Sequence, residues 1–278
     1  MENSTLGEMG EGRARIAAAF AAARAQRRAA LMPYLMGGFP DLDASRTIAA
    51  AYVEAGADLV ELGVPFSDPL ADGPVIHAAA TAALASGATL ETALEVCAAI
   101  AADVAVVPMC YANVVLAHGP AEFAAALAGA GAAGAIVPDL PPEEGGEIPA
   151  RLAEVGLPLV PLIAPTTPAE RRRRIGGRAE GFVYLVSDTR VTGERDELPA
   201  GLAELIETTK AEARVPVAVG FGIGTPEQAA AVGDHADGVI IGTRLVRTVG
   251  EAGDPATAAA AVGSFLRACR DALSLAAS

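Results

Sequence analysis

The sequence predicts a closed barrel of eight parallel β-strands, each followed by a helix. Eight short runs of apolar, often β-branched residues recur along the 278-residue chain, and most are apolar on both faces, as buried parallel strands require. Longer alanine-rich, amphipathic segments separate these runs, so strand and helix alternate throughout. Phrases such as EAGAD and GDHADG end a helix with glycine and lead into the next strand.

The expected elements follow in a regular order, and a helix over 13–28 precedes the first strand. The predicted strands are 30–36, 58–64, 104–110, 134–139, 157–163, 181–187, 215–221 and 237–243. The predicted helices between them are 45–55, 78–102, 120–130, 143–155, 199–212 and 226–232. A chain of 278 residues without a linker is typical of one (β/α)8, or TIM, barrel. We therefore expect a single domain over 1–278, with about the first 12 residues disordered.

The composition indicates a soluble, globular protein. The chain is 52% apolar and 19% charged, which is enough apolar residues for a sizeable core. A net charge of −14 disfavours nucleic acid and anionic membranes as partners, because both repel an acidic surface. No apolar run reaches membrane-spanning length and the polar N-terminal segment is unlike a secretory signal, so a cytoplasmic location is expected.

Cysteine and histidine give no sign of a metal site or a disulfide framework. Cys97, Cys110 and Cys269 are far apart in the sequence and form no C-x-x-C pair, which agrees with a reducing cytoplasm. The three histidines lack the spacing of metal ligands. The sequence therefore predicts no metal site.

Two carboxylates are the first candidates for chemistry. Glu61 lies near the carboxyl end of the strand predicted at 58–64, where barrel enzymes place their catalytic groups. Asp72 follows eleven residues later, in a loop rich in proline and glycine. Two such acids suggest general acid–base catalysis. The alternative is structural, because aspartate in such loops commonly makes a local turn hydrogen bond.

Two glycine turns predict a phosphate site. GFGIGTP, at 220–226, ends the seventh predicted strand, and IIGTR, at 240–244, ends the eighth. Glycines expose backbone N–H groups, and a short helix that starts at Thr243 would direct its positive end at an anion. An acidic protein can bind a phosphate in this way without many lysines. Ordinary tight turns remain the alternative reading.

Several segments together resemble one enzyme family. They are ELGVPFSDPLADGP (61–74), PYLMGGFPD, YANVVL, VPDLPPEE, YLVS followed by VTG, and GFGIGTPEQ. Taken over most of the chain, this pattern is similar to the tryptophan synthase alpha subunit. The resemblance implies a lyase that splits indole-3-glycerol phosphate in a retro-aldol reaction, without a cofactor in this chain.

The resemblance implies roles for individual residues. Glu61 would shuttle protons, and Asp72 would stabilise positive charge near the indole N–H. The implied phosphate ligands are Gly193, Gly222, Gly242 and Thr243. The candidates for an apolar indole pocket at the strand ends are Tyr34, Met109, Tyr111, Ile163, Tyr184 and Phe221, of which Tyr111 and Tyr184 align best with the family. Filling of the barrel core is the alternative for these side chains.

The resemblance also implies a partner. A beta subunit, which holds the pyridoxal phosphate, would join two such chains in an alpha2beta2 heterotetramer and receive the indole. The residues similar to the family's partner-facing loops are Pro65, Asp68, Asn113, Asp139 and Pro141. Two other functions stay open: a stand-alone lyase that releases free indole for another pathway, and a weakly catalytic subunit that activates the partner.

The chain departs from the family pattern after the sixth predicted strand. Asp188 stands where members often have arginine, and Arg190 stands where glycine is usual. We hypothesise that Arg190 compensates for the missing positive charge. A side chain that points into solvent is the alternative.

Overall fold

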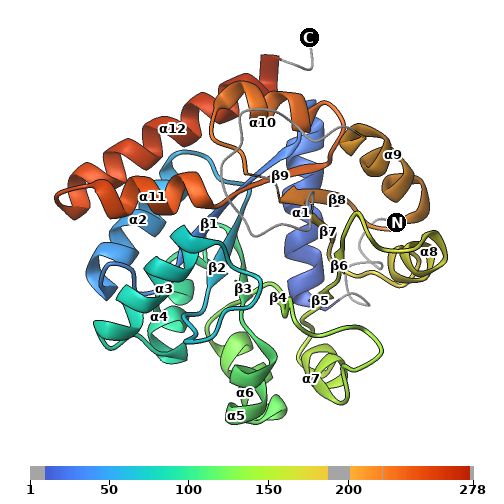
Figure 1. Cartoon of the computed structure of the whole chain (residues 1–278), viewed down its shortest axis with the longest axis horizontal. Helices are drawn as coiled ribbons and strands as arrows, with labels where there is room; N and C mark the ends of the chain where they lie inside the picture. Colours follow the sequence, from blue (N-terminus) through green and yellow to red (C-terminus); the bar gives the residue numbers. More distant parts are fainter. Residues whose placement is uncertain (1–9, 187–200, 221, 276–278) are drawn as a thin grey trace, which may run out of the picture.

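The computed structural model describes residues 10–186, 201–220 and 222–275. Its parallel strands pair in the order β5-β4-β3-β2-β1-β9-β8-β7-β6 (Figure 1). Only Pro161 separates β5 from β6 along the chain, so the two ends of this order meet and the sheet forms a nearly closed barrel. The strands are β1 (Ala30–Met36), β2 (Leu59–Gly63), β3 (Ala105–Met109), β4 (Ala135–Ile136), β5 (Leu159–Val160), β6 (Leu162–Ile163), β7 (Val183–Val186), β8 (Val217–Gly220) and β9 (Gly238–Ile241). The predicted barrel is therefore confirmed.

The helices surround the barrel, as Figure 1 shows. The strand predicted over 157–163 is divided into β5 and β6, because proline has no N–H to donate to a sheet. The helices are α1 (Glu11–Ala25), α2 (Leu42–Glu54), α3 (Pro74–Ala85), α4 (Leu90–Ile100), α5 (Ala112–His118), α6 (Pro120–Gly129), α7 (Ile148–Glu154), α8 (Ala169–Gly176), α9 (Leu202–Glu212), α10 (Pro226–Gly233), α11 (Thr243–Glu251) and α12 (Pro255–Leu275). Neither α5 nor α12 was among the predicted helices.

The single helix expected over 78–102 is wrong, because the segment forms two helices. Gly87 adopts a φ of +88°, which ends α3. Thr89 then begins α4 with a capping box, in which its side chain accepts from the backbone N–H of Thr92. These two helices meet at a bend of 104° and reach membrane-spanning length and apolarity only together. Within the described ranges, no single helix is long and apolar enough to cross a membrane.

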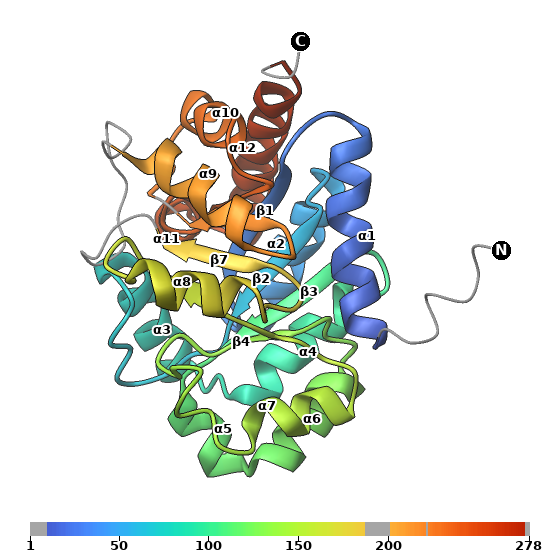
Figure 2. The same ribbon diagram turned by 90° about the vertical axis from the view of Figure 1, so that its right-hand side faces the viewer.

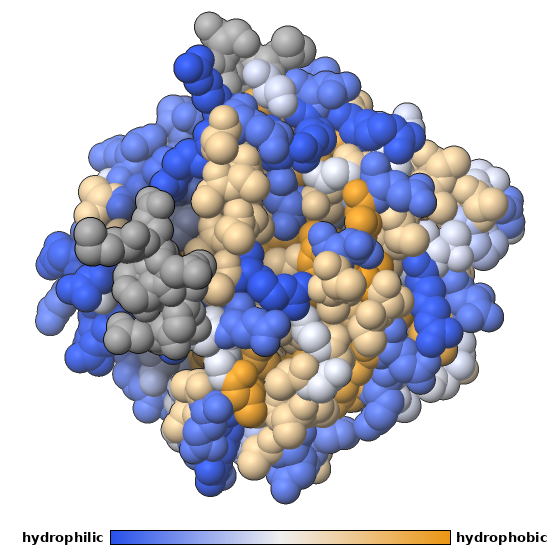
Figure 3. All heavy atoms as spheres, turned by 180° about the vertical axis from the view of Figure 1, so that it is seen from behind, coloured by the Kyte–Doolittle hydropathy of each residue, from blue (hydrophilic) through white to orange (hydrophobic). Residues whose placement is uncertain are grey.

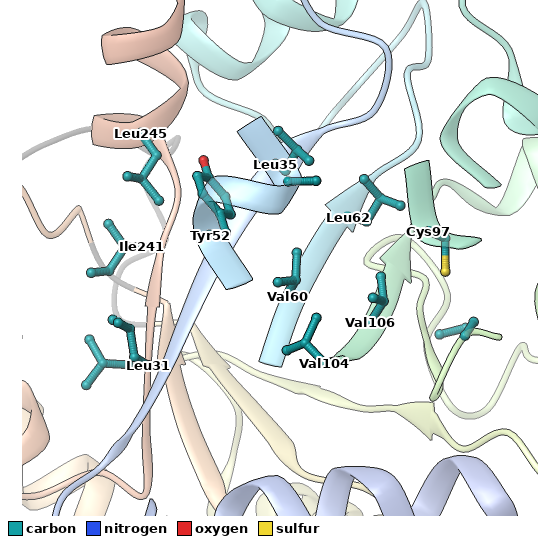
Figure 4. Close-up of a cluster of buried hydrophobic side chains, with 14 of the residues drawn as sticks. Leu31, Leu35, Tyr52, Val60, Leu62, Cys97, Val104, Val106, Ile241 and Leu245 are labelled. Atoms are coloured by element: carbon teal, nitrogen blue, oxygen red, sulfur yellow. The ribbon is translucent and has the colours of Figure 1, made fainter. Parts of the chain in front are cut away.

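The strands separate two apolar layers, and their alternation fixes which side chains face the barrel interior. Val60 and Leu62 of β2 pack outward, between the strands and the helices (Figure 4). Leu59, one residue earlier, packs in the interior cluster. Because successive side chains of a strand point to opposite faces, Glu61 shares the interior face with Leu59. The fold therefore aims this carboxylate into the barrel.

Helix α1 closes the end of the barrel at which the strands begin (Figure 2). Its Ile16 and Phe20 belong to the interior cluster, and the Phe20 ring lies 5.8 Å from that of Phe182. At the same end, buried Arg28 forms hydrogen bonds of 2.5 and 2.8 Å to the Asp58 carboxylate. The opposite end, where the strands finish, is left for the functional loops.

The surface opposite the view of Figure 1 shows hydrophilic residues around several smaller apolar patches (Figure 3). The large apolar side chains that are most exposed lie elsewhere, one on the loop after β2 and one on helix α5, which follows β3. They are Leu70, at 85% exposure, and Leu116, at 61%.

Candidate active site

Glu61 is a buried acid without a hydrogen-bond partner among the described residues. It lies on β2 opposite Tyr34 of β1 and Val107 of β3, and only 2% of it is exposed. Both of its carboxylate oxygens lack a partner. Burial, and then the charge of Asp72, raise its pKa from 4.5 to about 8. At neutral pH this group is mostly protonated and can therefore deliver a proton.

Asp72 lies in the loop between β2 and α3, where Tyr111, the N-cap residue of α5 just after β3, holds it. The hydroxyl of Tyr111 is hydrogen-bonded to the Asp72 carboxylate and accepts the backbone N–H of Ala71 at 3.0 Å. The Tyr111 ring stacks on Phe66 of the same loop, with ring centroids 5.2 Å apart. Three contacts thus fix the loop to the end of β3. Asp72 therefore has a hydrogen-bond partner outside its own turn.

The pKa of Asp72 lies below that of Glu61. Burial raises it from 3.8 to about 6, while the hydrogen bond from Tyr111 and the charge of His77 act in the opposite direction. At neutral pH Asp72 is therefore mostly ionised while Glu61 is mostly protonated. Such a separation between the pKa values of two neighbouring acids is typical of acid and base pairs in active sites.

Two further tyrosines stand next to the acids. Burial raises the pKa of Tyr34 and of Tyr184 well above the ordinary value, and the charges of Glu61 and Asp72 add to this. Each ring lies over a glycine: a Cβ at Gly63 would come within 2.6 Å of Tyr34 Cζ, and one at Gly220 within 2.6 Å of Tyr184 Cε1. The structure therefore brings both rings into the mouth. Met109, half-buried, contacts the interior cluster and the cluster around Tyr34.

Two of the pocket candidates, Ile163 and Phe221, differ from the others. Ile163 is fully buried in the outer cluster, between strands and helices, rather than in the interior. Its neighbour Leu162 packs on the interior cluster with Tyr184 and Met109, so it takes the place expected of Ile163. The sequence could not distinguish the two, because this segment is apolar on both faces. Phe221 lies outside the described residues.

Two of the four expected phosphate residues, Gly242 and Thr243, lie where α11 begins. Gly242 is the N-cap residue, with a buried Thr243 at the first helical position. A helix leaves its first N–H groups without partners inside the helix, and these together with the dipole favour an anion. Gly242 also lies beside the aromatic wall, because a Cβ there would be 3.6 Å from Tyr34 Cβ. Gly222 follows β8, whereas Gly193 and the altered positions Asp188 and Arg190 lie outside the described residues.

The residues expected to face a partner gather on the loops after β2, β3 and β4. Asp68, Asn113 and Asp139 are exposed, Pro141 is half-buried and Pro65 is buried. Asp139 accepts the backbone N–H of Ala112 at 2.9 Å, which ties the loop after β4 to the start of α5. The sequence analysis missed Leu70, on the loop after β2, and Leu116, on α5, which only their exposure identifies.

Metal-ligating side chains do not gather in the described part of the chain. Across residues 10–186, 201–220 and 222–275, no group of three or more His, Cys, Asp and Glu side chains has the arrangement of a metal site. The three cysteines are buried as free thiols, and burial raises the pKa of each one. Their thiolate forms are therefore disfavoured at neutral pH.

Comparison with known proteins agrees with the geometry. A family model described as tryptophan synthase alpha chain matches residues 20–273. The tryptophan synthase alpha chain of Carboxydothermus hydrogenoformans is 49% identical over 237 residues, which cover 84% of this chain and 89% of that one. The tryptophan synthase alpha chain of Roseiflexus castenholzii is 46% identical over 92% of this chain and 99% of its own. A solved structure of Mycobacterium tuberculosis tryptophan synthase matches with a TM-score of 0.86 at 38% identity, covering 93% and 98%. The chain therefore belongs to the tryptophan synthase alpha chain family.

Proposed function

We propose that this chain is a carbon–carbon lyase that cleaves indole-3-glycerol phosphate to indole and glyceraldehyde 3-phosphate, in tryptophan biosynthesis. The observation that supports this most directly is the pair of acids at the barrel mouth, one mostly protonated and one mostly ionised at neutral pH. A retro-aldol cleavage needs a proton donor and a stabilising negative charge at the same time.

Glu61 is the proposed proton shuttle. Its protonated carboxyl gives a proton to indole C3, which turns the ring into a leaving group. The resulting carboxylate then takes the proton of the adjacent chain hydroxyl. The C3–carbon bond breaks, its electron pair returns to the ring, and the hydroxyl carbon becomes the aldehyde carbon. One buried carboxyl, with its pKa raised to about 8, can perform both transfers.

Asp72 is the proposed electrostatic partner. Protonation of C3 places positive charge on the indole nitrogen, and a carboxylate near the N–H stabilises that charge. The hydrogen bond from Tyr111 favours the ionised form of Asp72 and orients it. Tyr34, Met109, Tyr111, Tyr184, Phe221 and, in place of Ile163, Leu162 are the proposed indole pocket.

The phosphate is proposed to bind at Gly193, Gly222, Gly242 and Thr243. The N-terminus of α11 supplies backbone donors there. Gly242 directly follows β9 and Glu61 lies on β2, and β1 pairs with both of these strands. A phosphate and an indole held at the two places would stretch the three-carbon chain across Tyr34.

The proposed partner is a tryptophan synthase beta subunit in an alpha2beta2 heterotetramer in the cytoplasm, with pyridoxal phosphate in the beta chain and no cofactor in this one. The solved relatives from Mycobacterium tuberculosis are structures of tryptophan synthase. Exposed Leu70 and Leu116, beside Asp68 and Asn113, offer apolar contacts at the loop end of the barrel.

One assay tests the activity and separates the alternatives. Indole release from indole-3-glycerol phosphate is followed with the purified chain, with and without a beta subunit. Mutual activation supports the complex, whereas full activity alone supports a stand-alone lyase. Glu61→Gln and Asp72→Asn are each expected to lose at least about 100-fold in kcat. The matched control is Glu251→Gln, on the exposed end of α11, and undiminished cleavage by Glu61→Gln would refute the mechanism.

A further inference from the structure

The mouth of the barrel contains three buried polar atoms without hydrogen-bond partners in the described part of the chain. They are the hydroxyl oxygen of Tyr34 and the two carboxylate oxygens of Glu61. Buried polar groups in native proteins are nearly always hydrogen-bonded, so each exception calls for an explanation. The mechanism above accounts for Glu61, which meets the reacting atoms. It leaves the Tyr34 hydroxyl without a role.

The Tyr34 hydroxyl contrasts with the hydroxyls of two other tyrosines. Tyr52, labelled in Figure 4, is also fully buried, but its hydroxyl donates to the backbone oxygen of Tyr34 at 3.1 Å. The Tyr111 hydroxyl has two partners, Asp72 and the N–H of Ala71. Burial alone therefore does not explain an unpaired hydroxyl in this barrel.

The position of Tyr34 relates it to the middle of the proposed substrate. Its backbone pairs with Glu61 on β2, and its Cβ lies beside Gly242 at the start of α11. Its ring extends from there over Gly63, where a side chain would overlap the tyrosine. Tyr34 thus lies between the phosphate site and the proton shuttle. A chain that connects a bound phosphate to an indole must pass it.

The hydroxyl also keeps its proton. Burial and the charges of Asp72 and Glu61 hold the pKa of Tyr34 well above its ordinary value. A neutral phenol donates one hydrogen bond and cannot compete with Glu61 as a base. The groups on the substrate that accept such a bond, between indole and phosphate, are the two chain hydroxyl oxygens.

We propose that the Tyr34 hydroxyl donates a hydrogen bond to a chain hydroxyl of the substrate and so selects a hydroxylated three-carbon linker over an unsubstituted one. This inference rests on the proposed function and adds a specificity determinant to it. A site that donates to a substrate hydroxyl discriminates against analogues that lack it, because its own donor is then left unpaired.

The test compares two ligands and two variants. Indole-3-glycerol phosphate is the hydroxylated ligand, and 3-(indol-3-yl)propyl phosphate keeps the indole and phosphate but lacks both hydroxyls. Tyr34→Phe is expected to raise KM for the first about five- to tenfold, with kcat changed less than about threefold. Its inhibition constant for the second should stay within about twofold. Tyr52→Phe is the matched control, with both constants unchanged and a lower Tm.

The outcomes are distinct. If Tyr34→Phe weakens both ligands equally or neither one, the hydroxyl does not read the linker and the inference is wrong. If the variant does not fold, the hydroxyl is structural and the inference is also wrong. Direct calorimetry in a Glu61→Gln background, where substrate is not consumed, gives a second measurement of the same ratio. Indole release by the wild-type chain is measured before any variant is made. If there is none, the proposed function is wrong, and this result is distinct from a failure of the inference about Tyr34.

Discussion

Replacing Glu61 by Gln should stabilise the fold more at pH 8 than at pH 5. Folding moves the carboxyl into the barrel and raises its pKa from 4.5 to about 8. The folded state therefore binds the proton more tightly than the unfolded state does. The contribution of protonated Glu61 to the free energy of unfolding is therefore complete below about pH 4.5 and is lost as pH rises through about 8.

The magnitude follows from the same two values. Moving a pKa from 4.5 to about 8 corresponds to about 5 kcal/mol in total, at roughly 1.4 kcal/mol per pH unit. By linkage, the free energy of unfolding has fallen by about 1 kcal/mol at pH 5 and by about 4 kcal/mol at pH 8, relative to low pH. Glutamine does not titrate, so any fixed effect of its amide is the same at both values. Between pH 5 and pH 8, the free energy of unfolding of Glu61→Gln should therefore rise by about 3 kcal/mol relative to that of the wild type.

Urea unfolding followed by far-UV circular dichroism at pH 5, 6.5 and 8 measures this difference. Glu251→Gln, which removes an exposed carboxylate of the same type, controls for the change in net charge. A difference between Glu61→Gln and the wild type that stays within about 0.5 kcal/mol across these pH values would refute the buried, protonated state of Glu61.

Three further predictions concern the mouth and the base of the barrel. kcat/KM should rise with pH through about 6, as Asp72 ionises, and fall through about 8, as Glu61 loses its proton; a flat profile would contradict both roles. Gly63→Ala should raise KM at least about tenfold and lower Tm, because its Cβ would collide with the Tyr34 ring, and wild-type kinetics would disprove that close approach. Arg28→Ala should lower the free energy of unfolding by about 1 to 3 kcal/mol with kcat unchanged, because it removes the two hydrogen bonds to the Asp58 carboxylate and leaves that group with the Leu31 N–H and the more distant Arg270; a loss under about 0.5 kcal/mol in urea unfolding would contradict this.

The fold was readable because the strands of a parallel barrel are continuous apolar runs, and all eight runs contain strand residues. Where the prediction was wrong, local backbone chemistry outweighed composition. Alanine-rich sequence continues from α3 to α4, but Gly87 and the capping box at Thr89 end one helix and begin another. Pro161 likewise interrupts a run whose hydropathy suggests one strand.

The candidate site was only partly readable. Strand alternation places Glu61 inside the barrel, and resemblance identifies Asp72, but no pattern in the sequence relates Asp72 to the Tyr111 hydroxyl, because that bond joins two loops 39 positions apart. Alternation also decides between Leu162 and Ile163, once the short strand β6 is located. The unpaired hydroxyl of Tyr34 is a property of packing and has no signal in the sequence.

Helix α1 limits the routes by which small molecules can reach and leave the site. Its Ile16 and Phe20 block the barrel at the end where the strands start, and the interior above them is filled by side chains. In the described part of the chain, this leaves the end where the strands finish as the route for substrate entry, indole exit and release of the aldehyde. A second enzyme that takes up indole directly, without loss to bulk water, has to bind over the end of the barrel where the strands finish. An enzyme bound at the α1 end would not receive the indole.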